Sequence, residues 1–218
     1  MDNIGKQRLI KRIVFSSCGL IIMVLGIAMY IKANIGAPCG DVIPVAVSHF
    51  TPLTVGQCAV LFHVLCIIMQ VLVTRRPQIK HVLQLPLAFA FGILMDVFLN
   101  LLDFELVNIF YRVALLLAGI IIFSFGIRVI VGSNLLLLPP DGLAREIGGI
   151  LGGAMSKGKL VFDIAVTLIA ILITLLLAGN AFLVVNIGTL ICAVGTGPLI
   201  GLYMKLFPFL DLNNKPNS

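Results

Sequence analysis

Six long apolar runs, separated by short polar or glycine- and proline-rich segments, dominate the chain. They cover residues 13–32, 55–74, 82–102, 111–131, 160–178 and 182–204. Each run approaches the roughly 20 residues that a helix needs to cross about 30 Å of hydrocarbon. Because a backbone in lipid must satisfy its own hydrogen bonds, runs of this length and composition predict six transmembrane helices.

The second half of the chain repeats small and polar residues of the first half at an offset of 100 residues. The pairs are Gly19 and Gly119, Gly26 and Gly126, Asn34 and Asn134, and Asp41 and Asp141. The offset grows to 105 between Gly92 and Gly197, as small loop insertions would produce. We therefore predict repeat one over about residues 13–102 and repeat two over about 111–205. Each repeat holds three spans, an odd number, so the second repeat is expected to be inverted in the membrane.

Each repeat also carries a break and a short helix after its first span. Glycine and proline residues in 36–40 stop the first span, and Asp41 stands where an N-cap residue would begin a short helix. In the second repeat, Pro139 and Pro140 are expected to break the chain, with Asp141 as the cap. Such helices either lie at the membrane interface or dip into the bundle as re-entrant segments, and the sequence leaves both open.

Composition and charge agree with a membrane protein. Hydrophobic residues make up 60% of the chain, charged residues 11%, and the mean hydropathy is +1.16, which excludes a soluble domain. Basic residues collect before the first span, between the second and third, between the fourth and fifth, and after the sixth. The positive-inside rule then predicts a multi-pass protein of the cytoplasmic membrane with both termini in the cytoplasm. The net charge of +6 orients the chain and attracts anionic lipid, so it calls for no nucleic-acid partner.

No pattern in the sequence indicates an enzyme, a cofactor or a metal site. The chain contains no HExxH, no GxSxG and no nucleotide-binding GxGxxG after a strand. Its five cysteines are odd in number, and Cys18, Cys66 and Cys192 lie well within spans, so they form no disulfide framework. The run "GGILGGAMSKGK" over residues 148–159 lacks the order of a phosphate-binding loop, and we interpret it as a flexible cytoplasmic loop.

The loop residues are the first candidates for substrate binding. Asp41 and Asp141 either act as helix caps alone, which is worth about 1 kcal/mol each, or also contribute to a site. Broken helices at a repeat interface are where transporters bind ions and solutes. Gly36, Asn34 and Asn134 belong to the same predicted set, although the two asparagines are more often helix terminators at the C′ position.

Polar residues inside the spans complete the candidate set. Asp96 in the third span would cost about 3 kcal/mol without water or a partner, so it is a candidate for substrate binding and proton coupling, unless it is wetted near the outer interface. His63 is either a proton-coupling residue or a helix–helix hydrogen-bond donor. Arg128 either snorkels or pairs with an anion. Asp163 is expected to pair with Lys159, four residues before it.

Two segments carry a resemblance to a known family: "IKANIGAPCGD" over residues 31–41 and "LTVGQ" over 53–57. They resemble the repeated signature of the bacterial YczE/YyaS/YitT-like integral membrane proteins. In that signature an Ala-x-x-Gly loop reaches an aspartate after the first span, and a Thr/Ser-x-Gly turn opens the second. The resemblance covers nearly the whole chain, and it implies a multi-span membrane protein without an established substrate. The chain departs from the signature at Cys39-Gly40, where such proteins often show Pro-Trp.

Together these features predict an all-α membrane protein of six transmembrane helices, built as two inverted three-helix repeats that each carry a short broken or re-entrant loop helix. We interpret it as a secondary transporter of a small solute or ion, with proton coupling as an option. The alternatives are a substrate-binding membrane subunit of a larger importer, and a non-transporting membrane factor that acts through protein partners. The lipid bilayer is the expected surrounding, and assembly into a homo-oligomer stays open.

Overall fold

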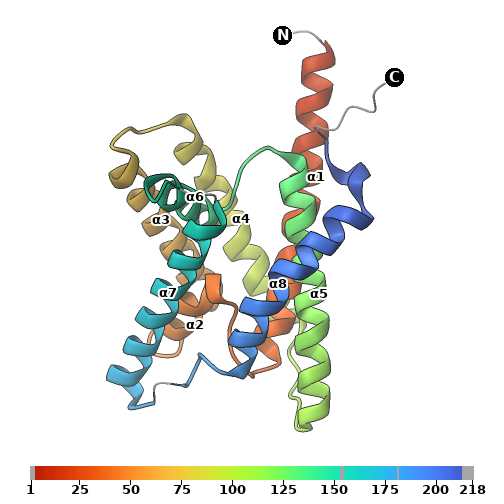
Figure 1. Cartoon of the computed structure of the whole chain (residues 1–218). Helices are drawn as coiled ribbons and strands as arrows, with labels where there is room; N and C mark the ends of the chain where they lie inside the picture. The colour runs from red at the N-terminus through yellow and green to blue at the C-terminus, as the bar shows by residue number, and fades with distance from the viewer. Residues whose placement is uncertain (1–2, 153–154, 181, 213–218) are drawn as a thin grey trace.

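The computed structural model describes residues 3–152, 155–180 and 182–212. These residues are all-helical and contain no strand. The α-helices are α1 (Asn3–Lys32), α2 (Val42–Ser48), α3 (Val55–Thr74), α4 (Ile79–Leu101), α5 (Ile109–Ser133), α6 (Pro139–Ile150), α7 (Met155–Ala178) and α8 (Ile187–Leu206), with 3-10 helices η1 (Cys39–Asp41) and η2 (Pro208–Leu210). Figure 1 shows their arrangement.

Six of these helices are long and apolar enough to cross a membrane, which confirms the predicted number of spans. They contain Leu9–Lys32, Val55–Thr74, Ile79–Leu101, Ile109–Ser133, Lys157–Ala178 and Ile187–Leu206. The last span was expected from residue 182 but begins at Ile187. The start is fixed at Asn186, whose backbone N–H donates to Thr189 Oγ1 at 3.4 Å across the first turn.

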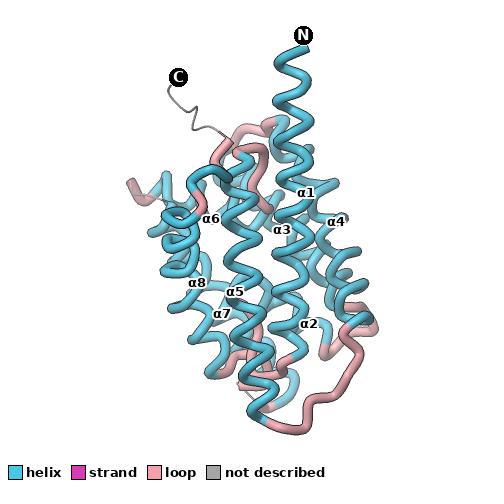
Figure 2. Tube along the Cα trace, turned by 90° about the vertical axis from the view of Figure 1, so that its right-hand side faces the viewer, coloured by secondary structure: helices cyan, strands magenta, loops and turns pink. Residues whose placement is uncertain are grey.

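Helices α1 and α5 lie side by side and run in opposite directions (Figures 1 and 2). Gly19 packs on Ile130, while Gly26, two turns further along α1, packs on Phe123. The approach is so close that a Cβ atom added to Gly19 would lie 2.9 Å from the backbone nitrogen of Ile130. Small residues permit such contact between membrane helices. Gly19 and Gly26 thus allow the backbones of α1 and α5 to approach closely.

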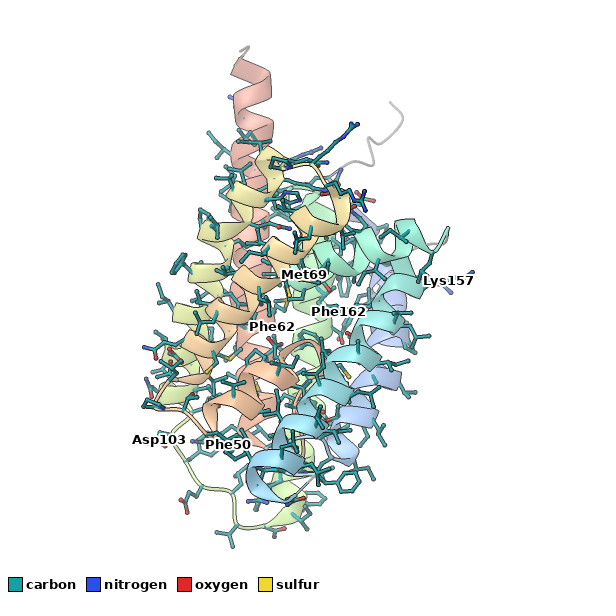
Figure 3. All side chains as sticks on the ribbon, turned by 90° about the vertical axis from the view of Figure 1, so that its left-hand side faces the viewer. Phe50, Phe62, Met69, Asp103, Lys157 and Phe162 are labelled. Atoms are coloured by element: carbon teal, nitrogen blue, oxygen red, sulfur yellow. The ribbon has the colours of Figure 1, made fainter. Side chains whose placement is uncertain are left out.

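Each short helix packs on a long helix from the other half of the chain. Helix α2 contacts α7, and α6 contacts α3. Apolar side chains of both short helices enter one core cluster, which includes Val42 and Leu143. Phe62 of α3 and Phe162 of α7 meet in this cluster, with ring centroids 6.4 Å apart (Figure 3). The short helices are therefore part of the bundle core.

Helices α1 and α5 are each followed by an asparagine with a left-handed backbone conformation. Asn34 and Asn134 have φ angles of +53° and +46°. Both lie in the left-handed region, which asparagine tolerates better than most residues because of its short polar side chain. The interpretation of these two residues as helix terminators is confirmed.

The start of α6 differs from the prediction. Asp141 was expected to cap the helix after a break at the prolines, but α6 begins at Pro139, and Leu138 holds the N-cap position. Proline suits the first turn of a helix, because its missing N–H would have no partner there and its φ angle is already helical. The prolines thus begin the helix, and Asp141 lies within its first turn.

The prediction of a flexible loop over residues 148–159 is also wrong for most of this range. Helix α6 continues through Ile150 and α7 begins at Met155, so most of this run is helical. Gly158 explains part of this, because its lack of a side chain lets α7 pack directly on the backbone of Ala144 and Gly148 in α6.

The start of α1 and the short helix η2 lie at the same end of the bundle (Figures 1 and 2). Leu212 N–H donates to the Gly132 carbonyl at 3.0 Å, and Arg12 Nη1 donates to the Asn134 carbonyl at 3.4 Å. These contacts join the first helix, the end of α5 and the C-terminal segment. The cytoplasmic orientation of this end stays a prediction.

Candidate functional site

Four charged residues gather where η1, the first turn of α6 and the first turns of α7 meet. We call Asp41, Asp141, Lys159 and Asp163 the charged cluster. Lys159 Nζ lies 3.1 Å from Asp141 Oδ1 and 3.2 Å from Asp163 Oδ1. The side chains of these three residues are 36%, 28% and 24% exposed, in the order Lys159, Asp141, Asp163. The predicted pair of Lys159 and Asp163 is confirmed, and Lys159 also joins α7 to α6.

Asp41 brings the first half of the chain to this cluster. The Lys159 ammonium lies beside η1, since a Cβ atom placed on Gly40 would be 4.0 Å from Nζ. Asp41 is buried, with 7% of its surface exposed, and it occupies the N-cap position of α2 without a side-chain capping hydrogen bond. Among the described residues, no hydrogen bond or ion pair to its carboxylate is formed. Capping alone therefore does not account for Asp41.

Burial and neighbouring charges determine the protonation states of Asp41 and Cys39 in η1, which lies outside the six spans. Burial raises the pKa of Asp41 to about 7, with Lys159 lowering it and the carboxylates of Asp141 and Asp163 raising it further. The Asp41 carboxyl group therefore exchanges its proton near neutral pH. Burial likewise raises the pKa of the Cys39 thiol to about 11, so Cys39 stays neutral and adds no charge to the cluster.

The first loop is held by the start of α8. Ala37 N–H donates to Thr189 Oγ1 at 3.3 Å, and Gly188 N–H donates to the Ile35 carbonyl at 3.0 Å. Gly36 has a φ of +137°, which favours glycine, and an added Cβ would lie 2.8 Å from the Thr189 nitrogen. Gly36 is thus a position of close backbone approach that sets the path of the loop into η1.

The second loop is held by two glutamines from the first half, which the sequence reasoning missed. Gln84 Nε2 on α4 donates to the Leu137 carbonyl at 3.1 Å, and Gln70 Nε2 on α3 donates to the Pro139 carbonyl at 3.0 Å. Both glutamines are at most 3% exposed. Two features of the sequence point to these glutamines. Both are amide side chains within apolar spans, and Gln84 lies 105 residues before Thr189, at the offset of the repeat in this region.

Asp96, near the C-terminal end of α4, lies against the start of α3 and has two partners there. Thr54 Oγ1 donates to Asp96 Oδ2 at 2.6 Å, and Gly56 N–H donates to Asp96 Oδ1 at 2.8 Å. A carboxylate at a helix N-terminus is stabilised by the unpaired N–H groups and the helix dipole. These contacts give Asp96 a structural role at the α3 terminus, apart from the charged cluster; its proton-coupling role stays a prediction.

His63 and Arg128 also lie deep in the bundle. The His63 ring packs on Phe91 with centroids 4.7 Å apart, and its Nδ1 has no hydrogen-bond partner among the described residues. Its proton-coupling role stays a prediction. Arg128 is 3% exposed, so it does not snorkel into water, and its Nη2 donates to the Phe207 carbonyl at 2.9 Å. The positive charge of Arg128 stabilises the C-terminus of α8 at this place. Asp141, an anionic group of the second half, pairs with Lys159 and not with Arg128.

A pocket of about 730 Å³ opens at the C-terminal end of α1. Two predicted substrate-binding residues, Asn34 and Gly36, line it, as do Ser48 and His49 at the end of α2. Since Asp41 is the N-cap of α2, this short helix runs between the pocket and the charged cluster. Asn134 lies apart from both, at the end of α5.

Six helices that are long and apolar enough to cross a membrane define a multi-pass helical membrane protein. The chain belongs to a family of unknown function, DUF6198, whose family model matches residues 10–205. Comparisons with curated proteins and with solved structures gave no match. The family match covers both halves of the chain, in line with the uncharacterised membrane family expected from the sequence. The specific likeness to the YczE/YyaS/YitT-like proteins stays a prediction.

Proposed function

We propose that the protein is a secondary transporter of a small solute or ion, built from two inverted three-helix repeats that share one charged site. The observation that carries this proposal is the origin of the charged cluster. Asp41 comes from the loop helix of the first half, and Asp141 comes from the corresponding position of the second half. Lys159 lies between them, and in many transporters such a junction of broken helices is the place where solutes bind.

Matched glycine contacts support the inverted relation of the two halves. If two copies pack around a two-fold axis, each contact must recur when both residue numbers move to the other copy. At the offset of 100, the packing of α1 on α5 meets this condition. The matched contacts are Gly19–Ile130 with Gly119–Tyr30, and Gly26–Phe123 with Gly126–Met23.

The loop contacts support the same relation independently. Thr189 on α8 binds the backbone of Ala37, whereas Gln84 on α4 binds the backbone of Leu137. The two loop residues are 100 positions apart, and the two helix residues are 105 apart, which are the offsets expected for these parts of the repeat. The side chains differ, but each loop is held by the last long helix of the opposite half.

Departures from this symmetry support a second conformation. Gly92 on α4 touches Gly56 on α3, but its counterpart Gly197 on α8 has no atom within 4 Å of an added Cβ. Helices at corresponding positions of the two halves thus pack differently in one molecule. An exchange of the two packings between the halves would close α7 on α8 and part α3 from α4. Such an exchange gives alternating access to the cluster without a change of fold.

A ligand screen on the detergent-purified protein tests this function. Inorganic ions and small organic solutes are tested for a rise in melting temperature, because a solute at about 100 times its Kd stabilises the native state by about 2.7 kcal/mol. We expect the effect to be lost in Asp141→Asn and kept in the control Asp103→Asn, whose side chain is 87% exposed. Uptake of the same solute into liposomes by the protein alone then separates a transporter from a capture subunit. A stabilising solute that is never taken up would contradict transport.

A further inference from the structure

We propose that the charged cluster exchanges one proton on Asp41 for one small monovalent cation, so that the protein is a cation–proton antiporter. This inference rests on the proposed function and names its substrate class. It follows from the net charge of the cluster and from the surroundings of Asp41. Lys159 carries the single ammonium group among the four residues of the cluster.

The charge of the cluster favours a cation. One ammonium group, that of Lys159, faces the two carboxylates with which it forms ion pairs, Asp141 and Asp163. With Asp41 protonated, the formal charge is +1 − 2 = −1, and with Asp41 ionised it becomes −2. A monovalent cation that binds the ionised form restores −1. The proton-loaded and cation-loaded forms therefore carry the same charge, and an anionic solute would meet net repulsion in either form.

Asp41 provides the second, independent observation. Its residue surface is more than nine-tenths buried, and its carboxylate has no hydrogen bond or ion pair among the described residues, although Lys159 lies beside the adjoining Gly40. A buried carboxylate without partners is costly in the ionised state. It therefore either holds a proton or takes up a cation from outside the protein.

The titratable groups that interact with Asp41 are all included in this assignment. Helix α7 contributes Lys159 and Asp163, α8 contributes Cys192, and α2 has no titratable side chain. The first turn of α6 adds Asp141, α3 adds Cys66, and η1 itself adds Cys39. Lys159 is the one positive group in this set, and it already forms ion pairs with Asp141 and Asp163.

The exchange step balances in atoms and charge without a redox reaction. The O–H bond of the Asp41 carboxyl group breaks, the proton passes to water, and the electron pair stays on the carboxylate. The carboxylate oxygens of Asp41 and its neighbours then replace part of the hydration shell of the incoming cation. The elevated pKa of Asp41, about 7, allows both forms to be populated at neutral pH.

Liposomes that contain the full-length protein and a pH-sensitive dye in the lumen test the exchange. NaCl, KCl or tetramethylammonium chloride is added outside, with a proton ionophore as the endpoint, and the three salts distinguish alkali metal ions from an organic cation. We expect the lumen to become alkaline with at least one salt. The initial rate should fall at least tenfold in Asp41→Asn, recover in part in Asp41→Glu, and stay unchanged in Asp103→Asn.

The outcomes separate this inference from the proposed function. An alkaline shift that is unchanged in Asp41→Asn would overturn the assignment of the proton to that residue. The absence of a shift with all three salts, while the ligand screen finds a transported solute, would overturn the antiport and leave the transporter intact. If neither assay gives a response in protein whose melting curve shows that it is folded, both proposals fail together.

Discussion

Lys159 Nζ and Asp141 Oδ1 are 3.1 Å apart, and this ion pair ties α7 to the first turn of α6. Replacing Lys159 by Ala leaves three carboxylates close together without a positive charge. We expect a loss of about 1–3 kcal/mol in unfolding free energy, because removing one partner of a half-buried ion pair leaves uncompensated charge. Lys159→Arg should keep most of the stability.

Thermal unfolding in detergent measures this difference, and Lys157→Ala is the matched control. Lys157 is exposed, two residues earlier on the same helix, so its loss should change stability by no more than about 0.5 kcal/mol. Equal melting temperatures for Lys159→Ala and Lys157→Ala would mean that the ion pairs do not stabilise the fold.

Asp41 should make stability depend on pH in a specific window. Its pKa is about 7 in the folded protein, against an ordinary value of 3.8. Between these values the folded state holds a proton that the unfolded state has released, so stability falls as the pH rises from about 4 to 7. The slope approaches about 1.4 kcal/mol per pH unit. In Asp41→Asn this part of the slope should vanish, as urea unfolding at several pH values would reveal; parallel curves for both proteins would refute the assignment.

The six long apolar helices could be predicted because each depends on local sequence alone. Run length and hydropathy define a span, and glycines such as Gly26 recur at fixed offsets. Asn34 and Asn134 were also correctly interpreted, because left-handed helix ends depend on a single residue type. These features need no knowledge of which helices meet.

The composition of the candidate site could be predicted only in part, because it depends on tertiary contacts. Asp41 and Asp141 were identified from the loops, but Lys159 was assigned to a flexible segment and its pairing with Asp141 was missed. Gln70 and Gln84 were missed because an amide within an apolar span carries no periodic signal. A reading of the 105-residue offset between Gln84 and Thr189 would have found one of them.

Asp96 is expected to act on stability and not on transport. Asp96→Ala removes the acceptor of Gly56 N–H and of the Thr54 hydroxyl at the start of α3, which should cost about 1–2 kcal/mol. Transport by the folded fraction, measured at low temperature, should stay within about twofold of wild type. An Asp96→Asn protein with unchanged stability but no proton coupling would instead support Asp96 as the proton carrier.

Gly197 tests the exchange of packings between the halves. Gly197→Leu should fold normally, because open space surrounds this position, but should block the closure of α7 on α8. We expect uptake to be at least tenfold slower. The matched control is Gly149→Leu, another helical glycine with no atom within 4 Å of an added Cβ. Wild-type uptake by both variants would argue against this second conformation.

The inverted relation of the two halves is the central claim, and side-specific cysteine labelling tests it most directly. Pro52→Cys follows α2, and Leu151→Cys follows α6; both positions are exposed, and the exposed Cys18 is changed to Ser in the background. A membrane-impermeant maleimide is applied to intact spheroplasts and to inside-out vesicles. The two-repeat structure predicts that the two cysteines react from opposite sides of the membrane. Reaction of both from the same side would contradict it.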